Sequence, residues 1–245
     1  MTGIPYVSET CNPITGCTRV SPGCDNCYAR RMAQRLCGRF GYPQGDPFRV
    51  TLHPERLEEP LHWAKPRMIF VCSMGDLFHP RVPWDFIFKV FNVMEQCPQH
   101  IFQVLTKRPG RMAHYAKGRI YPWPSTVWAG VSISEARQLP WLDVLRRVPA
   151  PVRFVSLEPC LGDVDLRPWL CWTGNAGDQF YSELDAPAVP PVLDWVILGP
   201  ETGPKARLME LDWARRVRDD CAAAGVPFFF KRGLLDGVEH RGMPG

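Results

Sequence analysis

Six short apolar runs limit what this chain can fold into more than any other feature of its sequence. Each run has four to six residues without strict alternation of apolar and polar side chains, as is typical of parallel strands buried on both faces. The runs are Met68–Cys72, Ile101–Leu105, Thr126–Val131, Val152–Leu157, Trp195–Leu198 and Val226–Phe230. Two shorter runs, Ile4–Val7 and Phe48–Leu52, are candidates for further strands of the same series.

Stretches with helical periodicity lie between several of these runs. Apolar residues recur on one helical face in Tyr28–Gly38, Pro83–Gln96 and Leu211–Ala224, and Gly225 stands where a helix C-cap is expected. Strands that alternate with helices along a chain indicate a parallel α/β fold. We therefore predict a partial or complete (β/α) barrel with parallel strands, of the radical SAM type by the resemblance described below.

Length and composition fit one such domain over residues 1–245. The chain has 245 residues and is 45% apolar, which is enough for one sizeable core. Residues 172–191 are rich in Gly, Asp, Ala and Pro, so an insertion loop is expected there. The sequence has neither an apolar run of about 18 residues nor a secretory signal pattern, and we expect a cytoplasmic protein with no membrane partner.

The charge of the chain does not identify a partner. The net charge is +4 with both signs interspersed and no block of Lys or Arg, which permits nucleic-acid binding without demonstrating it. No aromatic and basic platform for a single strand is recognisable in the sequence.

Polar residues follow the predicted strands at the end where a (β/α) barrel carries its chemistry. This placement predicts one rim of loops, formed by Ser73–Asp76, Lys107–Arg108, Ser132–Glu135, Glu158 and Glu201–Lys205. Glu158 and Lys231 each follow directly on an apolar strand, and ionisable groups in a site mouth are often functional, so both are candidate catalytic residues. Ordinary turns, a helix cap at Asp76 and solvated surface charges are the alternatives.

Half of the ten cysteines lie in the first 37 residues. The other five are expected to be buried as small apolar residues, and they are Cys72, Cys97, Cys160, Cys171 and Cys221. Four of the early cysteines lie in the loop of residues 11–28, where only two residues separate Cys24 from Cys27. Clustered cysteines in a protein of a reducing compartment point to metal ligation or catalysis rather than to disulfides.

Four interpretations of this loop compete. Cys17, Cys24 and Cys27 suit a cubane iron–sulfur cluster with one iron left open, which the N-terminus of a helix starting near Cys27 would favour. A closed zinc site would need Cys11 as a fourth ligand, although the five residues between Cys11 and Cys17 suit a zinc motif poorly. A redox dithiol at Cys24 and Cys27, or thiols packed in a core without metal, are the other two.

The motifs of the chain, taken in order, resemble a known family. TGCTRVSPGCDNCYA is followed by SMGDLFHP, LTKRPGRM, SLEPCLG, DWVILGPETGPKAR and VPFFFK, a series similar to the three-Cys-motif proteins of phages and bacteria. That family has no known function and is grouped with radical SAM enzymes. The resemblance spans about Cys11 to Lys231.

Members typically have Trp where this chain has Cys11, which implies that the ligands are Cys17, Cys24 and Cys27. Six residues and then two separate these cysteines, where most radical SAM enzymes have three and then two, so a three-residue insertion is implied.

The resemblance implies a chemistry and its cofactors. Radical SAM enzymes bind S-adenosylmethionine (SAM) at a 4Fe–4S cluster and cleave it reductively to a 5′-deoxyadenosyl radical that abstracts hydrogen. The implied cofactor contacts are Ser73, Met74, Gly75 and Asp76 near the methionyl amino group, Gly199 and Glu201 near ribose and adenine, and Lys107 near the carboxylate or a substrate phosphate.

The substrate and partners remain expectations. We expect a nucleic-acid base or nucleotide as substrate, because of the phage association, the rim cations and a motif layout similar to DNA photoproduct lyases. A flavodoxin or ferredoxin is expected as reductant, and a partner protein is a further expectation. The alternative from another class is a non-catalytic, zinc-stabilised module that binds nucleic acid or protein through Cys11, Cys17, Cys24 and Cys27. A cluster that only transfers electrons is a third hypothesis.

Overall fold

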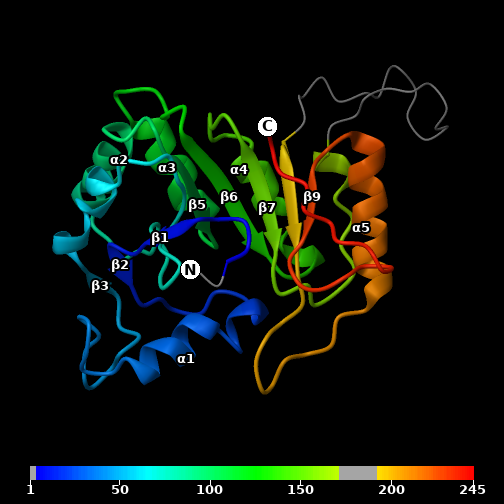
Figure 1. Cartoon of the computed structure of the whole chain (residues 1–245), viewed down its shortest axis with the longest axis horizontal. Helices are drawn as coiled ribbons and strands as arrows, with labels where there is room; N and C mark the ends of the chain where they lie inside the picture. Colours follow the sequence, from blue (N-terminus) through cyan, green and yellow to red (C-terminus); the bar gives the residue numbers. More distant parts are fainter. Residues whose placement is uncertain (1–3, 171–191) are drawn as a thin grey trace.

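A seven-stranded, fully parallel sheet is the main element of the fold (Figure 1). It is seen in a computed structural model that describes residues 4–170 and 192–245, so the expected loop at 172–191 and Cys171 lie outside the described residues. The strands are β1 (Glu9–Cys11), β4 (Met68–Val71), β5 (Ile101–Thr106), β6 (Val127–Ile133), β7 (Arg153–Leu157), β8 (Trp195–Leu198) and β9 (Phe228–Phe230).

The strands lie side by side in the order in which they occur along the chain, from β1 through β4 to β9. When consecutive parallel strands are always added at the same edge of the sheet, all the connecting helices lie on one face. This is the arrangement of a barrel, whereas a doubly wound sheet has helices on both faces. Within the described ranges β1 and β9 do not pair with each other, so the barrel is open. The prediction of a partial (β/α) barrel with parallel strands is confirmed.

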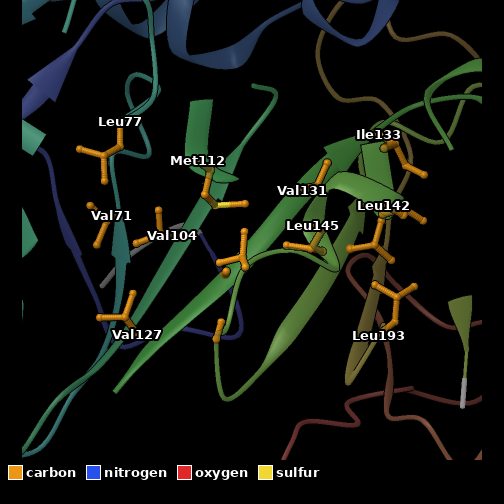
Figure 2. Close-up of a cluster of buried hydrophobic side chains, with 14 of the residues drawn as sticks. Val71, Leu77, Val104, Met112, Val127, Val131, Ile133, Leu142, Leu145 and Leu193 are labelled. Atoms are coloured by element: carbon orange, nitrogen blue, oxygen red, sulfur yellow. The ribbon is translucent and has the colours of Figure 1, made fainter. Parts of the chain in front are cut away.

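The helices cover the outer face of this sheet, except for α1. They are α1 (Tyr28–Arg35), α2 (Trp84–Glu95), α3 (Pro109–Gly118), α4 (Pro140–Leu145) and α5 (Leu211–Ala224). The apolar sides of α2 to α5 share one core with alternate residues of the strands. Figure 2 shows part of this core, where Met112 of α3 and Leu142 and Leu145 of α4 lie near Val104 and Val131 of the sheet. Short 3-10 helices occupy Pro22–Cys24, Pro54–Arg56, Glu59–His62, Ala136–Gln138 and Arg167–Trp169.

Aromatic side chains fill the inner face of the half-barrel. The alternation of side chains along the strands places Phe70, Trp128, Phe154, Trp195 and Phe229 on this face. Tyr6 packs edge-on against Trp195 and Phe229, with ring centroids 5.4 and 5.3 Å apart, and so covers the open side of the sheet. A side chain at Gly130 would lie 2.4 Å from the ring of Phe154, so this strand position has room only for glycine.

Both predictions of shorter strands in the main sheet were wrong. Ile4–Val7 forms no strand, because Pro5 lacks a ladder donor and Tyr6 turns its ring into the inner face, and the first strand is instead Glu9–Cys11. Phe48–Leu52 does not extend the main sheet. Only β3 (Thr51–Leu52) is extended, and it pairs antiparallel with β2 (Ile14–Thr15) in a separate two-stranded sheet.

The helices agree better with the sequence pattern. Leu211–Ala224 is helical as predicted, and Gly225 adopts the left-handed conformation at its C-cap with φ 68°. The predicted Tyr28–Gly38 ends earlier, at Arg35. A further helix, α3, begins at Pro109, where no helix was predicted. No helix within residues 4–170 or 192–245 combines the length and the apolar character needed to cross a membrane.

Candidate functional site

The cysteine loop lies against the loops that leave the carboxyl ends of the strands. Gly16 forms a parallel bridge with Gly75, and its N–H donates to the carbonyl of Met74 at 2.9 Å. In Figure 1, α1 follows this loop below the lower edge of the sheet, where the strands end. The predicted rim and the cysteines therefore share one edge of the half-barrel.

Cys17, Cys24 and Cys27 are all half-buried in this loop. Cys17 and Cys27 pack, together with Met74, on a small apolar cluster of Ala29, Ala33, Tyr42 and Phe48. Cys27 is the N-cap of α1, next to the unpaired N–H groups of the first helical turn. Cys24 ends the 3-10 turn Pro22–Cys24, and its Sγ lies 3.7 Å from the hydroxyl of Ser21.

Cations of the rim reach two of these thiols. Arg108 Nη1 donates to Cys17 Sγ at 3.3 Å. Burial and the charge of Asp76 raise the pKa of Cys17 to about 11, and Arg108 opposes this shift. Burial also acts against the Cys24 thiolate, but the charge of Lys107 and hydrogen bonds at Val20 and Ser21 outweigh it, and the pKa of Cys24 is lowered.

Asp76 anchors the cysteine loop from the β4 side. Its side chain is 6% exposed and forms an ion pair of 3.0 Å with Arg108, while Thr106 donates to its second oxygen at 2.7 Å. Arg108 also donates to the carbonyl and hydroxyl of Thr18 at 2.9 and 3.0 Å. His79 is buried, and its Nε2 lies 2.9 Å from the same hydroxyl.

Glu201 anchors the loop from the β8 side. Its carboxylate accepts from Arg207 Nε at 2.9 Å and from Asn26 Nδ2 at 2.8 Å. Arg207 also donates to the carbonyl of Pro22 at 2.8 Å. The hydrogen bonds from Arg207 lower the pKa of Glu201 to about 2 despite its burial. Arg207 Nη2 also donates to Oε1 of Glu201, so both carboxylate oxygens are used within the protein.

The segment after β4 holds the other side of the loop through close backbone contacts. Ser73 Oγ and the N–H of Met74 both donate to Asn12 Oδ1, at 3.1 and 2.9 Å. Tyr28 donates its hydroxyl proton to the carbonyl of Ser73. A side chain at Gly75 would lie 2.9 Å from the carbonyl oxygen of Ile14, so glycine permits this approach.

Four polar side chains lie on the inner face at the carboxyl ends of the strands, next to the aromatic residues of that face. Alternation along the strands turns Lys107, Ser132, Glu158 and Lys231 to this face. Lys107 Nζ donates to Ser132 Oγ at 3.0 Å, and Lys231 Nζ lies 2.9 Å from Glu158 Oε1. A side chain at Gly199 would lie 2.9 Å from Glu158 Oε1 and 3.1 Å from Lys231 Cβ. Gly199 thus makes room for the ion pair.

Cys11 is separate from the other three cysteines. It is buried in the main core, and burial raises the pKa of its thiol to about 12. The cysteines predicted to be buried apolar residues are so at positions 72, 97, 160 and 221. No group of three or more His, Cys, Asp or Glu that could hold a metal ion occurs in the part of the chain that the structure describes.

Several residues of the site had no recognisable signal in the sequence. Arg207 and Asn26 contact Glu201 from loops that are 6 and 175 residues away along the chain. Thr18 and Tyr6 were not predicted either, because nothing in the sequence distinguishes them from other loop or N-terminal residues. Their contacts depend on segments that are distant in the sequence and meet only in the folded chain.

Comparison with known proteins identifies a family. A family model described as "Protein of unknown function (DUF5131)" matches residues 1–239. No curated protein matches the chain. No solved structure matches it either. Because the family match covers almost the whole chain, this protein belongs to the DUF5131 family of proteins of unknown function.

Proposed function

We propose that this protein is a radical SAM enzyme whose 4Fe–4S cluster is held by Cys17, Cys24 and Cys27. The observation that carries the proposal is the position of these three half-buried thiols, over the carboxyl edge of a parallel half-barrel and beside Lys107 and Arg108. The motif series from Cys11 to Lys231 and its similarity to the three-Cys-motif family support it from the sequence.

Three cysteine thiolates are the donor set of a cubane cluster with one iron left open, and they bind three different irons of it. Thiolates and sulfides are anionic, and the adjacent Lys107, Arg108 and helix N-terminus supply the compensating positive charge.

When bound, such a cluster supplies the electron that cleaves a C–S bond of SAM and yields a 5′-deoxyadenosyl radical. The chain itself positions the reactants. Lys107 presents an ammonium to the carboxylate of SAM or to a substrate phosphate. The backbone of Ser73, Met74, Gly75 and Gly199 is already hydrogen-bonded within the protein, so we propose that these residues contact the cofactor by close packing. Asp76 and Glu201 act as positioning residues, because their carboxylates are already bound to Arg108 and Arg207.

Glu158 and Lys231 are the proposed catalytic residues. Their ion pair lies at the mouth of the inner face, where the carboxylate can accept and the ammonium can donate a hydrogen bond to substrate. The aromatic side chains beneath them keep water from the inner side of this pair. We propose a nucleic-acid base or nucleotide as substrate, with a flavodoxin or ferredoxin as reductant and a partner protein as a further possibility to be tested.

The zinc-stabilised binding module is the second candidate. It would need Cys11 as a fourth ligand, but Cys11 belongs to the main core while Cys17 and Cys27 pack on a different cluster. A closed four-cysteine site would therefore require the loop to rearrange.

The metal content of cysteine variants tests the proposal. After anaerobic reconstitution, we expect about four irons and four sulfides per chain, a loss of both in Cys17→Ala, and normal content in Cys11→Ala. Cys37→Ala is the matched control, since Cys37 is a half-buried thiol of the same region that donates to the carbonyl of Gln44. Stoichiometric zinc that disappears in Cys11→Ala would overturn the proposal in favour of the second candidate.

A further inference from the structure

A groove on the outer surface, between α2 and α3, is lined by exposed aromatic side chains. Trp84 and Phe88 lie one turn apart on α2 and are 41% and 52% exposed. Ile120 and Tyr121 follow α3 and are 92% and 63% exposed. A contiguous group of large apolar side chains this exposed is typical of a binding surface.

Basic side chains of α3 lie beside the groove. Arg111, His114 and Lys117 follow one another at intervals of three residues and therefore share one face of α3. The guanidinium of Arg111 lies 4.0 Å from the ring centroid of Trp84, and the His114 ring lies 5.4 Å from it. Arg111 donates to the carbonyls of Pro80 and Val82, which fixes it over the ring.

The two helices that flank the groove, together with Arg119, carry a net positive charge, since Lys89, Arg111, Lys117 and Arg119 outnumber Asp85 and Glu95. Lys89 and Lys117 are exposed, and neither forms an ion pair with any described residue. Of the nearby acids, Glu95 is neutralised by Arg119, which leaves Asp85 among the lining residues. A protein segment that covered this groove would need acidic side chains to match these cations, whereas a nucleic acid carries a negatively charged phosphate at every nucleotide.

We propose that this groove binds single-stranded nucleic acid, with bases stacked on Phe88 and Tyr121 and phosphates along Lys89, Arg111 and Lys117. Aromatic faces beside a positively charged track are the general means of binding single strands. From Arg111 to its end at Gly118, α3 follows the groove for about 10 Å, which fits about three stacked nucleotides at 3.4 Å each. Single-stranded DNA and RNA share this chemistry.

The groove begins near the candidate site. Arg111 lies one helical turn beyond Arg108, which contacts Cys17. A strand held in the groove would therefore lead toward the rim, and the inference supplies a substrate class for the proposed function. It does not need iron or SAM, so its failure and the failure of the proposed function are separable.

Fluorescence anisotropy with labelled ten-nucleotide oligothymidine and oligouridine tests the proposal on the full chain without added iron or SAM. We expect binding that weakens about tenfold in Phe88→Ala and in Tyr121→Ala, as for the loss of one stacked base. Lys117→Glu is expected to weaken binding and to lower the slope of log Kd against log salt by about 0.7 or more, since one phosphate contact is lost. The oligothymidine and oligouridine arms distinguish DNA from RNA.

Two exposed residues outside the groove provide the controls. Leu234 follows β9, at the opposite end of the sheet from α2, and Arg147 follows α4. Leu234→Ala and Arg147→Glu are expected to bind as the unchanged protein does. Absence of binding by either oligonucleotide, equal weakening by the control variants, or full displacement by poly-glutamate would overturn the proposal. The last outcome would favour an acidic protein partner instead.

Discussion

At the scale of single residues, the ion pair of Glu158 and Lys231 can be tested directly by substitution. The two side chains are 17% and 22% exposed, so a lone carboxylate left by Lys231→Met would be poorly solvated. We expect this variant to lose about 1–3 kcal/mol in free energy of unfolding, with part recovered in Glu158→Gln/Lys231→Met. Denaturant titration measures both, and Arg232→Met, an exposed neighbour, is the control. No loss in Lys231→Met would show that the pair is solvated in solution.

His79 predicts a pH dependence of stability. Burial and the charge of Arg108 lower its pKa from 6.5 to about 4, although Asp76 opposes the shift. The unfolded chain therefore binds a proton first as pH falls, and the contribution of His79 is complete above pH 6.5 and is lost between 6.5 and about 4. The loss amounts to about 3 kcal/mol at 1.36 kcal/mol per pKa unit. The free energy of unfolding of His79→Gln should fall less steeply over this range, and parallel curves would contradict the assignment.

Gln103 is a buried amide on the inner face. Neither its Nε2 nor its Oε1 has a hydrogen-bond partner among the described residues, and its side chain is fully buried. An unsatisfied buried amide costs about 1–3 kcal/mol, so the isosteric Gln103→Met should raise the free energy of unfolding by a similar amount. Thermal and denaturant unfolding check the sign. A decrease would mean that water or a ligand satisfies the amide.

At the scale of elements, the cysteine loop is held by anchors from two strands, Asp76 after β4 and Glu201 after β8. Glu201→Gln would weaken the hydrogen bonds to Arg207 and so loosen the loop from one side while Asp76 holds the other. We expect faster amide hydrogen exchange in residues 17–27 and unchanged exchange in the strands. Arg218→Gln removes a surface pair with Asp236 and is the control. Unchanged exchange in the loop would show that Glu201 is not an anchor.

Which elements form was largely predictable, and which side chains meet was not. The buried parallel strands and the helix of Leu211–Ala224 each have a local apolar pattern in the sequence. These local patterns were enough to predict the half-barrel. The two anchors depend on partners brought together by topology, since Asn26 lies 175 residues from Glu201. The aromatic groove between α2 and α3 could not be predicted either, because no helix was predicted at Pro109–Gly118.

At the scale of the whole molecule, the half-barrel gathers polar loops on one edge and leaves its inner face apolar. The three cysteines cover that edge, and Lys107, Glu158 and Lys231 line the mouth below them. The rim was predictable because carboxyl ends of parallel strands meet at one edge. We propose that a 4Fe–4S cluster held at this edge by three cysteines leaves one iron open to SAM.

Low-temperature EPR of the anaerobically reconstituted, dithionite-reduced protein, with and without SAM, tests that claim most directly. We predict the signal of a reduced 4Fe–4S cluster that changes in g values when SAM is added, because the amino and carboxylate groups of SAM would bind the iron that has no cysteine. The same signal should be lost in Cys17→Ala and retained in Cys37→Ala. A cluster signal that SAM leaves unchanged, or a protein that takes up zinc and no iron, would contradict the account.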